Sequence, residues 1–171
     1  MIVSVKEVEV TNSGNLAVDW ARWQREAIEK SCKQIYGAER WLKSASHVVR
    51  AGGTKGPDLP AKDSRRIHRV AVSLGSKGAV PFRSGDFGKG FVHVFTEASL
   101  SVIFSELDTI SDFIAYLGKK ETYLRSGARV RIKPGGTEKD LLALYLHLDR
   151  SFPDTLKVIL VDDTLWRGLI A

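Results

Sequence analysis

Residues 91–124 read FVHVFTEASLSVIFSELDTISDFIAYLGKKETYL. The segment begins as a short alternating strand, and an amphipathic helix is expected to start at Thr96, whose hydroxyl can cap the first turn. The helix is expected to end near Gly118 or to continue to Leu124. Its apolar residues follow the three-and-four spacing of one helical face: Leu100, Ile103, Phe104, Leu107, Ile110, Ile114 and Leu117. A strand that leads directly into such a helix predicts helices packed on a sheet.

The opposite face of this predicted helix carries Glu106, Asp108 and Asp112. A solvated face is the favoured interpretation of these acids. Because Asp108 and Asp112 are four residues apart, joint binding of a divalent cation is the minor alternative.

Turn residues and apolar periodicity predict the remaining elements. In chain order they are a strand at Ile2–Val10, a helix from Asp19 to about Lys43, a loop at 51–63, a strand at Ile67–Leu74, a connection at 75–90, a short strand at Val130–Lys133, a helix capped by Thr137 with Asp140 and a strand at Leu156–Val161. This alternation predicts an α/β or α+β fold, in which helices flank a mixed β-sheet. A length of 171 residues favours a single globular domain over residues 1–171.

Composition narrows the class of protein. The chain has no apolar run long enough for a membrane span and no signal-peptide pattern, and its single cysteine, Cys32, excludes an internal disulfide framework. We therefore expect a cytoplasmic protein without a membrane partner.

The net charge of +6 is concentrated in the middle of the chain. Residues 49–90 hold nine basic and three acidic residues, so the rest of the chain is neutral on balance. A basic segment on a neutral scaffold suits DNA or RNA, although a solvated, loop-rich insertion without a ligand is the favoured interpretation, because basic loops are common. The candidate phosphate contacts are Arg65, Arg66, Arg69, Lys55 and Lys62.

The histidines are a weaker indication of a functional site. His68 and His93 lie in predicted strands and could meet across the sheet, although ordinary hydrogen-bonded histidines are the favoured interpretation.

The first strand carries a possible catalytic pattern, Ser4-Val5-Lys6-Glu7. In PD-(D/E)XK nucleases an acidic residue two positions before a strand lysine helps to bind the metal, and the lysine helps to activate water. Here Ser4 occupies the acidic position, so the pattern is incomplete. The helix that follows bears Lys30, Lys33 and Gln34.

Four longer blocks carry a resemblance to a known group of proteins. They are DWARWQREAIEKSCKQIYGAERWL, RIHRVAVSLG, FVHVFTEASLSVIFSELDTISDFIAYLGKKE and EKDLLALYLHL. They resemble an uncharacterised bacterial protein family with a restriction-endonuclease-like core, over most of residues 2–148. Longer members have an aspartate-bearing segment before a Ser-Asp-Lys strand, which Ser4-Val5-Lys6 would match with Val5 in place of the aspartate.

This resemblance implies a nuclease-like, nucleic-acid-associated domain with weak or lost metal-dependent phosphodiesterase activity. Lys6, Glu7, Lys30 and Gln34 would form the catalytic group, and Glu7 with Glu9 would hold Mg²⁺ or Mn²⁺. Because the upstream segment is absent, the chain could be a truncated product, an inactive relative, or one that borrows acids such as Glu7 or Glu9.

A non-enzymatic interaction or homo-oligomerisation domain is the alternative. Four tryptophans are many for this length, and aromatic residues suit interfaces as well as cores. They are Trp20, Trp23, Trp41 and Trp166.

Overall fold

The computed structural model describes residues 1–75, 82–126, 130–132, 137–153 and 159–161. The strands are β1 (Ile2–Glu7), β2 (His47–Val49), β3 (Lys55–Asp58), β4 (Arg69–Leu74), β5 (Gly85–Asp86), β6 (Phe91–Thr96), β7 (Val130–Ile132) and β8 (Ile159–Val161). The helices are α1 (Leu16–Trp23), α2 (Lys30–Ser44), α3 (Glu97–Glu106), α4 (Ile110–Arg125) and α5 (Glu138–His147), with a π-helical turn η1 (Gln24–Glu29) and a 3-10 turn η2 (Lys62–Ser64).

A mixed four-stranded sheet in the order β1-β4-β6-β5 organises the fold. β1, β4 and β6 are parallel, and β5 runs antiparallel to β6. β2 with β3 and β7 with β8 form two further pairs. The predicted fold class, a mixed sheet flanked by helices, is confirmed.

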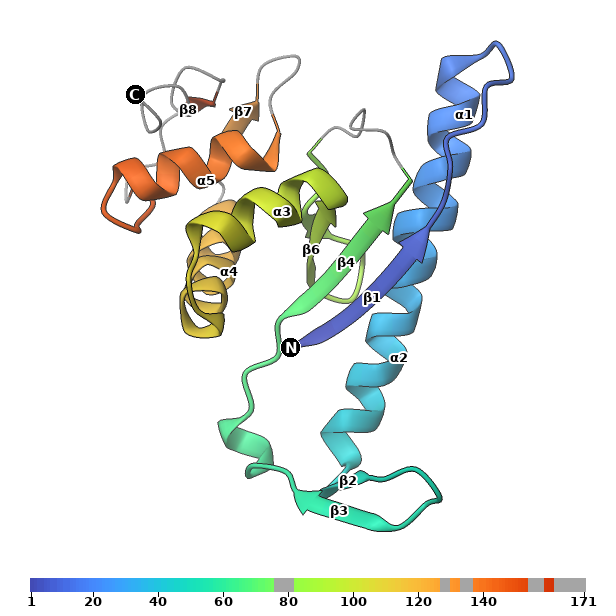
Figure 1. Cartoon of the computed structure of the whole chain (residues 1–171), viewed down its shortest axis with the longest axis vertical. Helices are drawn as coiled ribbons and strands as arrows, with labels where there is room; N and C mark the ends of the chain where they lie inside the picture. Colours follow the sequence, from blue (N-terminus) through green and yellow to red (C-terminus); the bar gives the residue numbers. More distant parts are fainter. Residues whose placement is uncertain (76–81, 127–129, 133–136, 154–158, 162–171) are drawn as a thin grey trace.

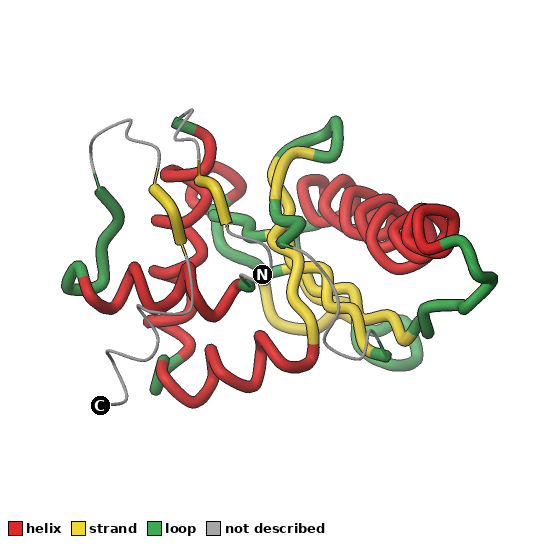
Figure 2. Tube along the Cα trace, turned by 90° about the horizontal axis from the view of Figure 1, so that it is seen from above, coloured by secondary structure: helices red, strands yellow, loops and turns green. Residues whose placement is uncertain are grey.

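Helices cover both faces of the sheet (Figures 1 and 2). The continuous helical segment α1–η1–α2 packs on one face, where Trp23, Ile28 and Ile35 meet Val92 and Val94. On the other face α3, α4 and α5 pack against β4 and β6 around a core that includes Val70, Val72, Phe95, Ile103, Leu117 and Leu141. The sheet is thus the middle layer of three.

The prediction of a single helix after Thr96 is wrong, because the segment forms two helices, α3 and α4. Thr96 does cap α3, but α3 ends at Glu106 and Leu107 is extended, with φ −111° and ψ 99°. Thr109 then caps α4 by accepting a hydrogen bond from the Asp112 N–H. The break places Asp108 between the helices, and Asp112 is bonded to Arg150, so the alternative of a shared cation on one helical face loses its geometric basis.

The start of the first helix also differs from the prediction. Asn15 rather than Asp19 caps α1. Asp19 instead lies inside the first turn, where its carboxylate accepts bonds from the Ser13 N–H and the Thr11 hydroxyl. These bonds, led by the one from Ser13, hold the pKa of Asp19 below its ordinary value.

The expected loop at 51–63 contains regular structure. β2 and β3 pair as an antiparallel hairpin that lies at the end of the molecule remote from α1 (Figure 1). The capping box predicted at Thr137 and Asp140 is present at the start of α5. Of the expected strand at 156–161, residues 159–161 form β8, whereas 156–158 and Trp166 lie outside the described residues.

A buried ion pair links α4 to α5. Lys120 is 0% exposed, and its Nζ donates to both carboxylate oxygens of Glu138 at 2.6 and 2.7 Å. The Tyr116 hydroxyl donates to the same carboxylate at 2.6 Å. Burial lowers the pKa of Lys120 and raises that of Glu138, so each charge depends on the other for its stability.

Lys120→Met is therefore expected to destabilise the fold by about 3–5 kcal/mol, because it leaves Glu138 buried without its cation. Adding Glu138→Gln should recover most of the loss, since the amide oxygen still accepts from Tyr116. Urea unfolding of the single and double variants measures both effects. Lys119→Met, at the exposed neighbouring position, is the control, and equal losses at positions 119 and 120 would contradict the role of the pair.

Candidate functional site

The residues expected around Lys6 are partly brought together. Ser4 donates to the Gln34 side-chain oxygen at 3.0 Å, which places α2 against β1. Lys30 forms an ion pair with Glu26 and, more strongly than Lys6, holds the pKa of that carboxyl below its ordinary value. Lys6, Lys30 and Gln34 thus lie on the same side of the sheet, between β1 and the helix.

The carboxylates of the predicted metal site lie elsewhere. Residues alternate between the two faces of a strand, so Glu7 points away from the face that Lys6 shares with α2. Glu7 and Glu9 are both exposed. In the described parts of the chain, neither belongs to a group of three potential metal ligands. The geometry does not assemble acids and Lys6 into one site.

The candidate phosphate contacts divide into structural and exposed residues. Arg65 donates to the carbonyls of Leu42, Ala45 and Pro60, and so satisfies acceptors at the end of α2. Arg69 binds both oxygens of Glu39, at 2.5 and 2.7 Å. The exposed members of the set are Arg66, Lys62 and Lys55, the last of which pairs with Asp58.

A basic hollow that sequence reasoning missed lies along the flank of α2 remote from β1. We call it the α2 groove, and its volume is about 550 Å³. An adjoining hollow of about 300 Å³ shares Tyr36, Arg40 and Lys89 and adds Glu39 and Lys43. The main hollow is lined by Glu29, Cys32, Lys33, Tyr36, Arg40, Phe87 and Lys89.

Local hydrogen bonds shape the wall of the α2 groove opposite the helix. Asp86 accepts from the N–H groups of Gly88 and Gly90, which closes the turn that carries Phe87 and Lys89. Gly90 adopts φ +114°, and a Cβ there would lie 3.0 Å from the Arg69 guanidinium. The Tyr36 hydroxyl donates to the Gly90 carbonyl at 2.7 Å and ties the turn to α2.

The sequence did contain a signal for one side of this groove. Lys33, Tyr36 and Arg40 follow the i, i+3, i+7 spacing of one helical flank. The other side could not be foreseen, because it comes from a turn more than forty residues away that only the β5–β6 pairing brings to α2.

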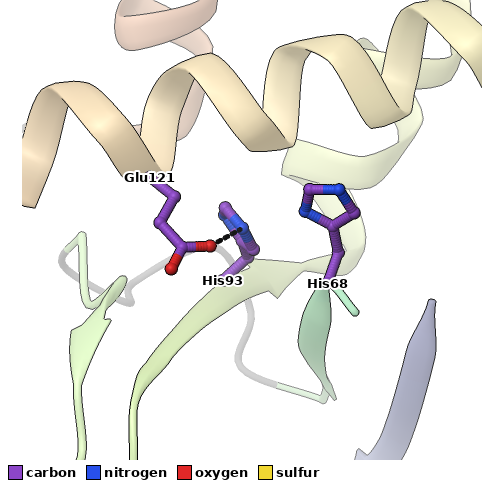
Figure 3. A group of neighbouring side chains, drawn as sticks. All are labelled: His68, His93 and Glu121. Atoms are coloured by element: carbon purple, nitrogen blue, oxygen red, sulfur yellow. Dashed lines mark ion pairs between the residues drawn. The ribbon is translucent and has the colours of Figure 1, made fainter. Parts of the chain in front are cut away.

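His68, His93 and Glu121 form a second polar cluster, on the opposite face of the sheet (Figure 3). The predicted meeting of the two histidines is confirmed, with ring centroids 6.3 Å apart. Glu121 from α4 approaches them, and its Oε2 lies 3.9 Å from His93 Nε2. One ligand atom from each of the three residues lies within 4.8 Å of the others.

The expected hydrogen bonds of an ordinary core histidine are absent at His93 in the described part of the chain. Its ring is 0% exposed, and neither nitrogen has a hydrogen-bond partner among the residues that the structure describes. His68 Nδ1 is also buried, without a partner among the same residues. Burial lowers the pKa of His93 to about 2, with a smaller effect from the Lys120 charge, so its ring is neutral at physiological pH.

Comparisons of this chain with known proteins give no match from which a function could be inferred. The chain matches no known protein family, and no curated protein or solved structure matches it. No helix among the residues that the structure describes is long and apolar enough to cross a membrane. Function must therefore be argued from the geometry itself.

The Glu39–Arg69 ion pair beside the α2 groove predicts a specific loss of stability in acid. Arg69 lowers the pKa of Glu39 from 4.5 to about 2, so the pair stabilises the fold fully above pH 4.5, and that contribution is lost as the pH falls toward 2. Glu39→Gln should cost about 2 kcal/mol at pH 7 and remove this part of the pH dependence. Urea unfolding between pH 7 and pH 3 tests it.

The control is Glu9→Gln, which removes an exposed carboxylate. It should leave the acid-dependent loss as in the original protein. An unchanged pH dependence in Glu39→Gln would show that the ion pair does not stabilise the fold.

Proposed function

We propose that this protein associates with nucleic acid through the α2 groove, by binding phosphates along a single strand. The observation that carries the proposal is the convergence of Lys33, Arg40 and Lys89 on one hollow that also contains Tyr36 and Phe87. Proteins that bind single strands without sequence preference combine a basic channel for the backbone with aromatic rings on which bases stack.

The balance of charges in the groove favours an anionic ligand. Among the described residues, two carboxylates line the two hollows, those of Glu29 and Glu39. Glu39 is already paired with Arg69 and, at 2.9 Å, with Lys43. The three cations at Lys33, Arg40 and Lys89 are thus opposed chiefly by Glu29.

Exposed basic residues extend beyond the groove. The β2–β3 hairpin follows α2 directly, and Arg50 and Lys55 are exposed on it. Arg66 and Lys62 are exposed in the segment between the hairpin and β4. A ligand longer than the groove would find further phosphate contacts in this direction.

Association rather than cleavage is the activity that we propose. In the nuclease expected from the resemblance, Lys6 would act beside metal-binding carboxylates. Glu7 is exposed on the other side of β1 from Lys6, Glu9 is exposed beyond the end of β1, and Glu26, the acid on which the Lys6 charge acts, is engaged by Lys30. Phosphodiester hydrolysis at β1 would accordingly be weak or absent.

Salt dependence tests the α2 groove. Fluorescence anisotropy with a short labelled DNA or RNA strand should show binding at low salt. The slope of log K against log salt is negative, and its magnitude should decrease by about 0.7 for each lost phosphate contact. Lys33→Gln, Arg40→Gln and Lys89→Gln are each expected to produce this change.

Lys119→Gln is the matched control, because Lys119 is exposed on α4, on the opposite side of the sheet. A loss of affinity as large in this variant as in Arg40→Gln, or no binding by the original protein at low salt, would refute the proposal that the α2 groove binds the strand. The probe should remain uncut in Mg²⁺ or Mn²⁺. Cleavage that Lys6→Ala abolishes would instead support the nuclease.

A self-associating interaction domain is the second candidate, and the outer edge of β1 favours it. β1 is the terminal strand of the sheet, and Val3 and Val5 on it are 46% and 57% exposed. An edge strand with exposed β-branched residues is a ready surface for pairing with a second copy.

Sedimentation at high protein concentration distinguishes this candidate. A dimer that Val5→Lys converts to a monomer would support pairing through β1. Leu16→Lys, at a residue of α1 that is 70% exposed, is the control and should leave the dimer intact. A strictly monomeric original protein would exclude the second candidate.

A further inference from the structure

We propose that His68, His93 and Glu121 bind a divalent transition-metal ion of the Zn²⁺ class. This site lies on the face of the sheet opposite the α2 groove, and the inference is independent of nucleic-acid binding. It rests on the convergence of three side chains from separate elements and on the unpaired nitrogens in a buried place (Figure 3).

The sheet register places the two histidines side by side. His93 is opposite Val70 on the neighbouring strand, and His68 lies two residues before Val70, so both rings project toward α4. α4 passes close to His68 at Gly118, where a Cβ would make an ordinary van der Waals contact with the His68 ring at 3.6 Å. Glu121 follows three residues later on α4 and faces the same site (Figure 3).

The distances need little adjustment. Zn²⁺ bound tetrahedrally through nitrogen and oxygen at about 2.0–2.2 Å holds its ligand atoms about 3.4 Å from one another. Here the Glu121 oxygen is 3.9 Å from His93 Nε2, and all three ligand atoms lie within 4.8 Å. Small side-chain rotations would therefore bring the atoms into coordinating positions.

The buried nitrogens are the second, independent observation. A polar atom in the core that forms no hydrogen bond destabilises the fold, and native proteins rarely retain one. His93 leaves both ring nitrogens in this state, and His68 leaves Nδ1. Metal coordination would satisfy one lone pair on each ring.

Neighbouring groups hold the ligands in a suitable form. His93 packs against the rings of Phe91 and Phe95, with centroids 5.0 and 6.3 Å away, which restricts its rotation. Burial also lowers the pKa of His68 and His93, so both present the neutral imidazole that metals bind. Arg125 holds Glu121 Oε1 at 3.0 Å and leaves Oε2 directed at His93.

Most of the positive charge near this site is neutralised by carboxylates, which limits its repulsion of a metal ion. Arg69 is paired with Glu39 and Lys120 with Glu138, so most of their charge is compensated within the protein. Among the other cations, Arg125 contacts the carboxylate oxygen that faces away from His93, and the charges of Arg66 and of the N-terminal ammonium act on His68.

The donor set selects the class of ion. Two imidazoles and one carboxylate suit Zn²⁺ and related transition metals, whereas Mg²⁺ and Ca²⁺ prefer oxygen ligands. Three protein ligands leave a fourth tetrahedral position for water or another small ligand. The ion would also join the residue that precedes β4 and the middle of β6 to α4.

Isothermal titration of the chelator-treated protein with ZnCl₂ tests the proposal, with Co²⁺ absorption as a report of coordination. One ion per chain and the intense visible bands of tetrahedral Co²⁺ are expected. Glu121→Gln should weaken Zn²⁺ binding at least about tenfold, because losing a ligand costs no less than losing a group that only orients one. His68→Gln should do the same, and His93→Phe should abolish binding.

Glu121 and His68 are partly exposed, so their variants keep the test valid if His93→Phe does not fold. His47→Asn on the hairpin is the matched control and should bind Zn²⁺ as the original protein does. Absence of binding, or equal affinity in the original protein, Glu121→Gln and His68→Gln, would overturn the proposal, since any Zn²⁺ would then be bound elsewhere.

Discussion

Burial of β6 on both faces is the constraint on which the rest of the structure depends. Residues Phe91–Phe95 are all buried, so apolar side chains leave this strand in both directions and each face must be covered. Val92 and Val94 require the α1–η1–α2 layer, and Phe95 requires the layer of α3, α4 and α5. β4 and β6 run parallel although no described helix connects them: the chain between them contains β5, which pairs antiparallel with β6.

His93 interrupts this apolar strand at its centre, and comparison with Lys120 shows why it is informative. Both side chains are 0% exposed and lie in the same layer. Lys120 has a full set of compensating contacts, with the Glu138 carboxylate at 2.6 Å and the Phe95 ring centroid at 4.6 Å. The buried ammonium group of Lys120 is thus fully paired, whereas the imidazole of His93 has no hydrogen bond within the described residues. The proposed ion would account for this difference and for the positions of His68 and Glu121.

Local signals in the sequence predicted local structure well. The threonine caps at Thr96 and Thr137 act through hydrogen bonds to residues three positions away, so they are readable without knowing the fold. The break at Leu107–Thr109 was missed because the apolar spacing from Ile103 to Ile110 continues across it. Thr109 is a second N-capping residue in this region, and the chain starts a new helix there although the apolar periodicity predicts that the first helix continues.

Residues of the candidate sites depend on tertiary contacts and were correspondingly harder to predict. The two histidines were paired correctly, because strands one connection apart are often neighbours. Glu121 could not be added, since nothing in its own segment tells which turn of α4 lies over the sheet. Arg65 and Arg69 looked like surface cations, yet their partners are helix-end carbonyls and a carboxylate on α2, which only folding brings within reach.

The role of Arg69 also changes how the charge of the α2 groove should be understood. Glu39 is 5% exposed and lines the hollow that adjoins the groove, where without Arg69 it would place a negative charge beside Arg40 and Lys43. Arg69 reaches Glu39 from β4, so the charge is neutralised from the sheet while the lysines and Arg40 remain at the surface. The bidentate contact between Arg69 and Glu39 also stabilises the packing of α2 on β4. One ion pair therefore both attaches the helix to the sheet and leaves its outer flank positive, which makes the proposed binding surface a consequence of core packing and not only of net charge.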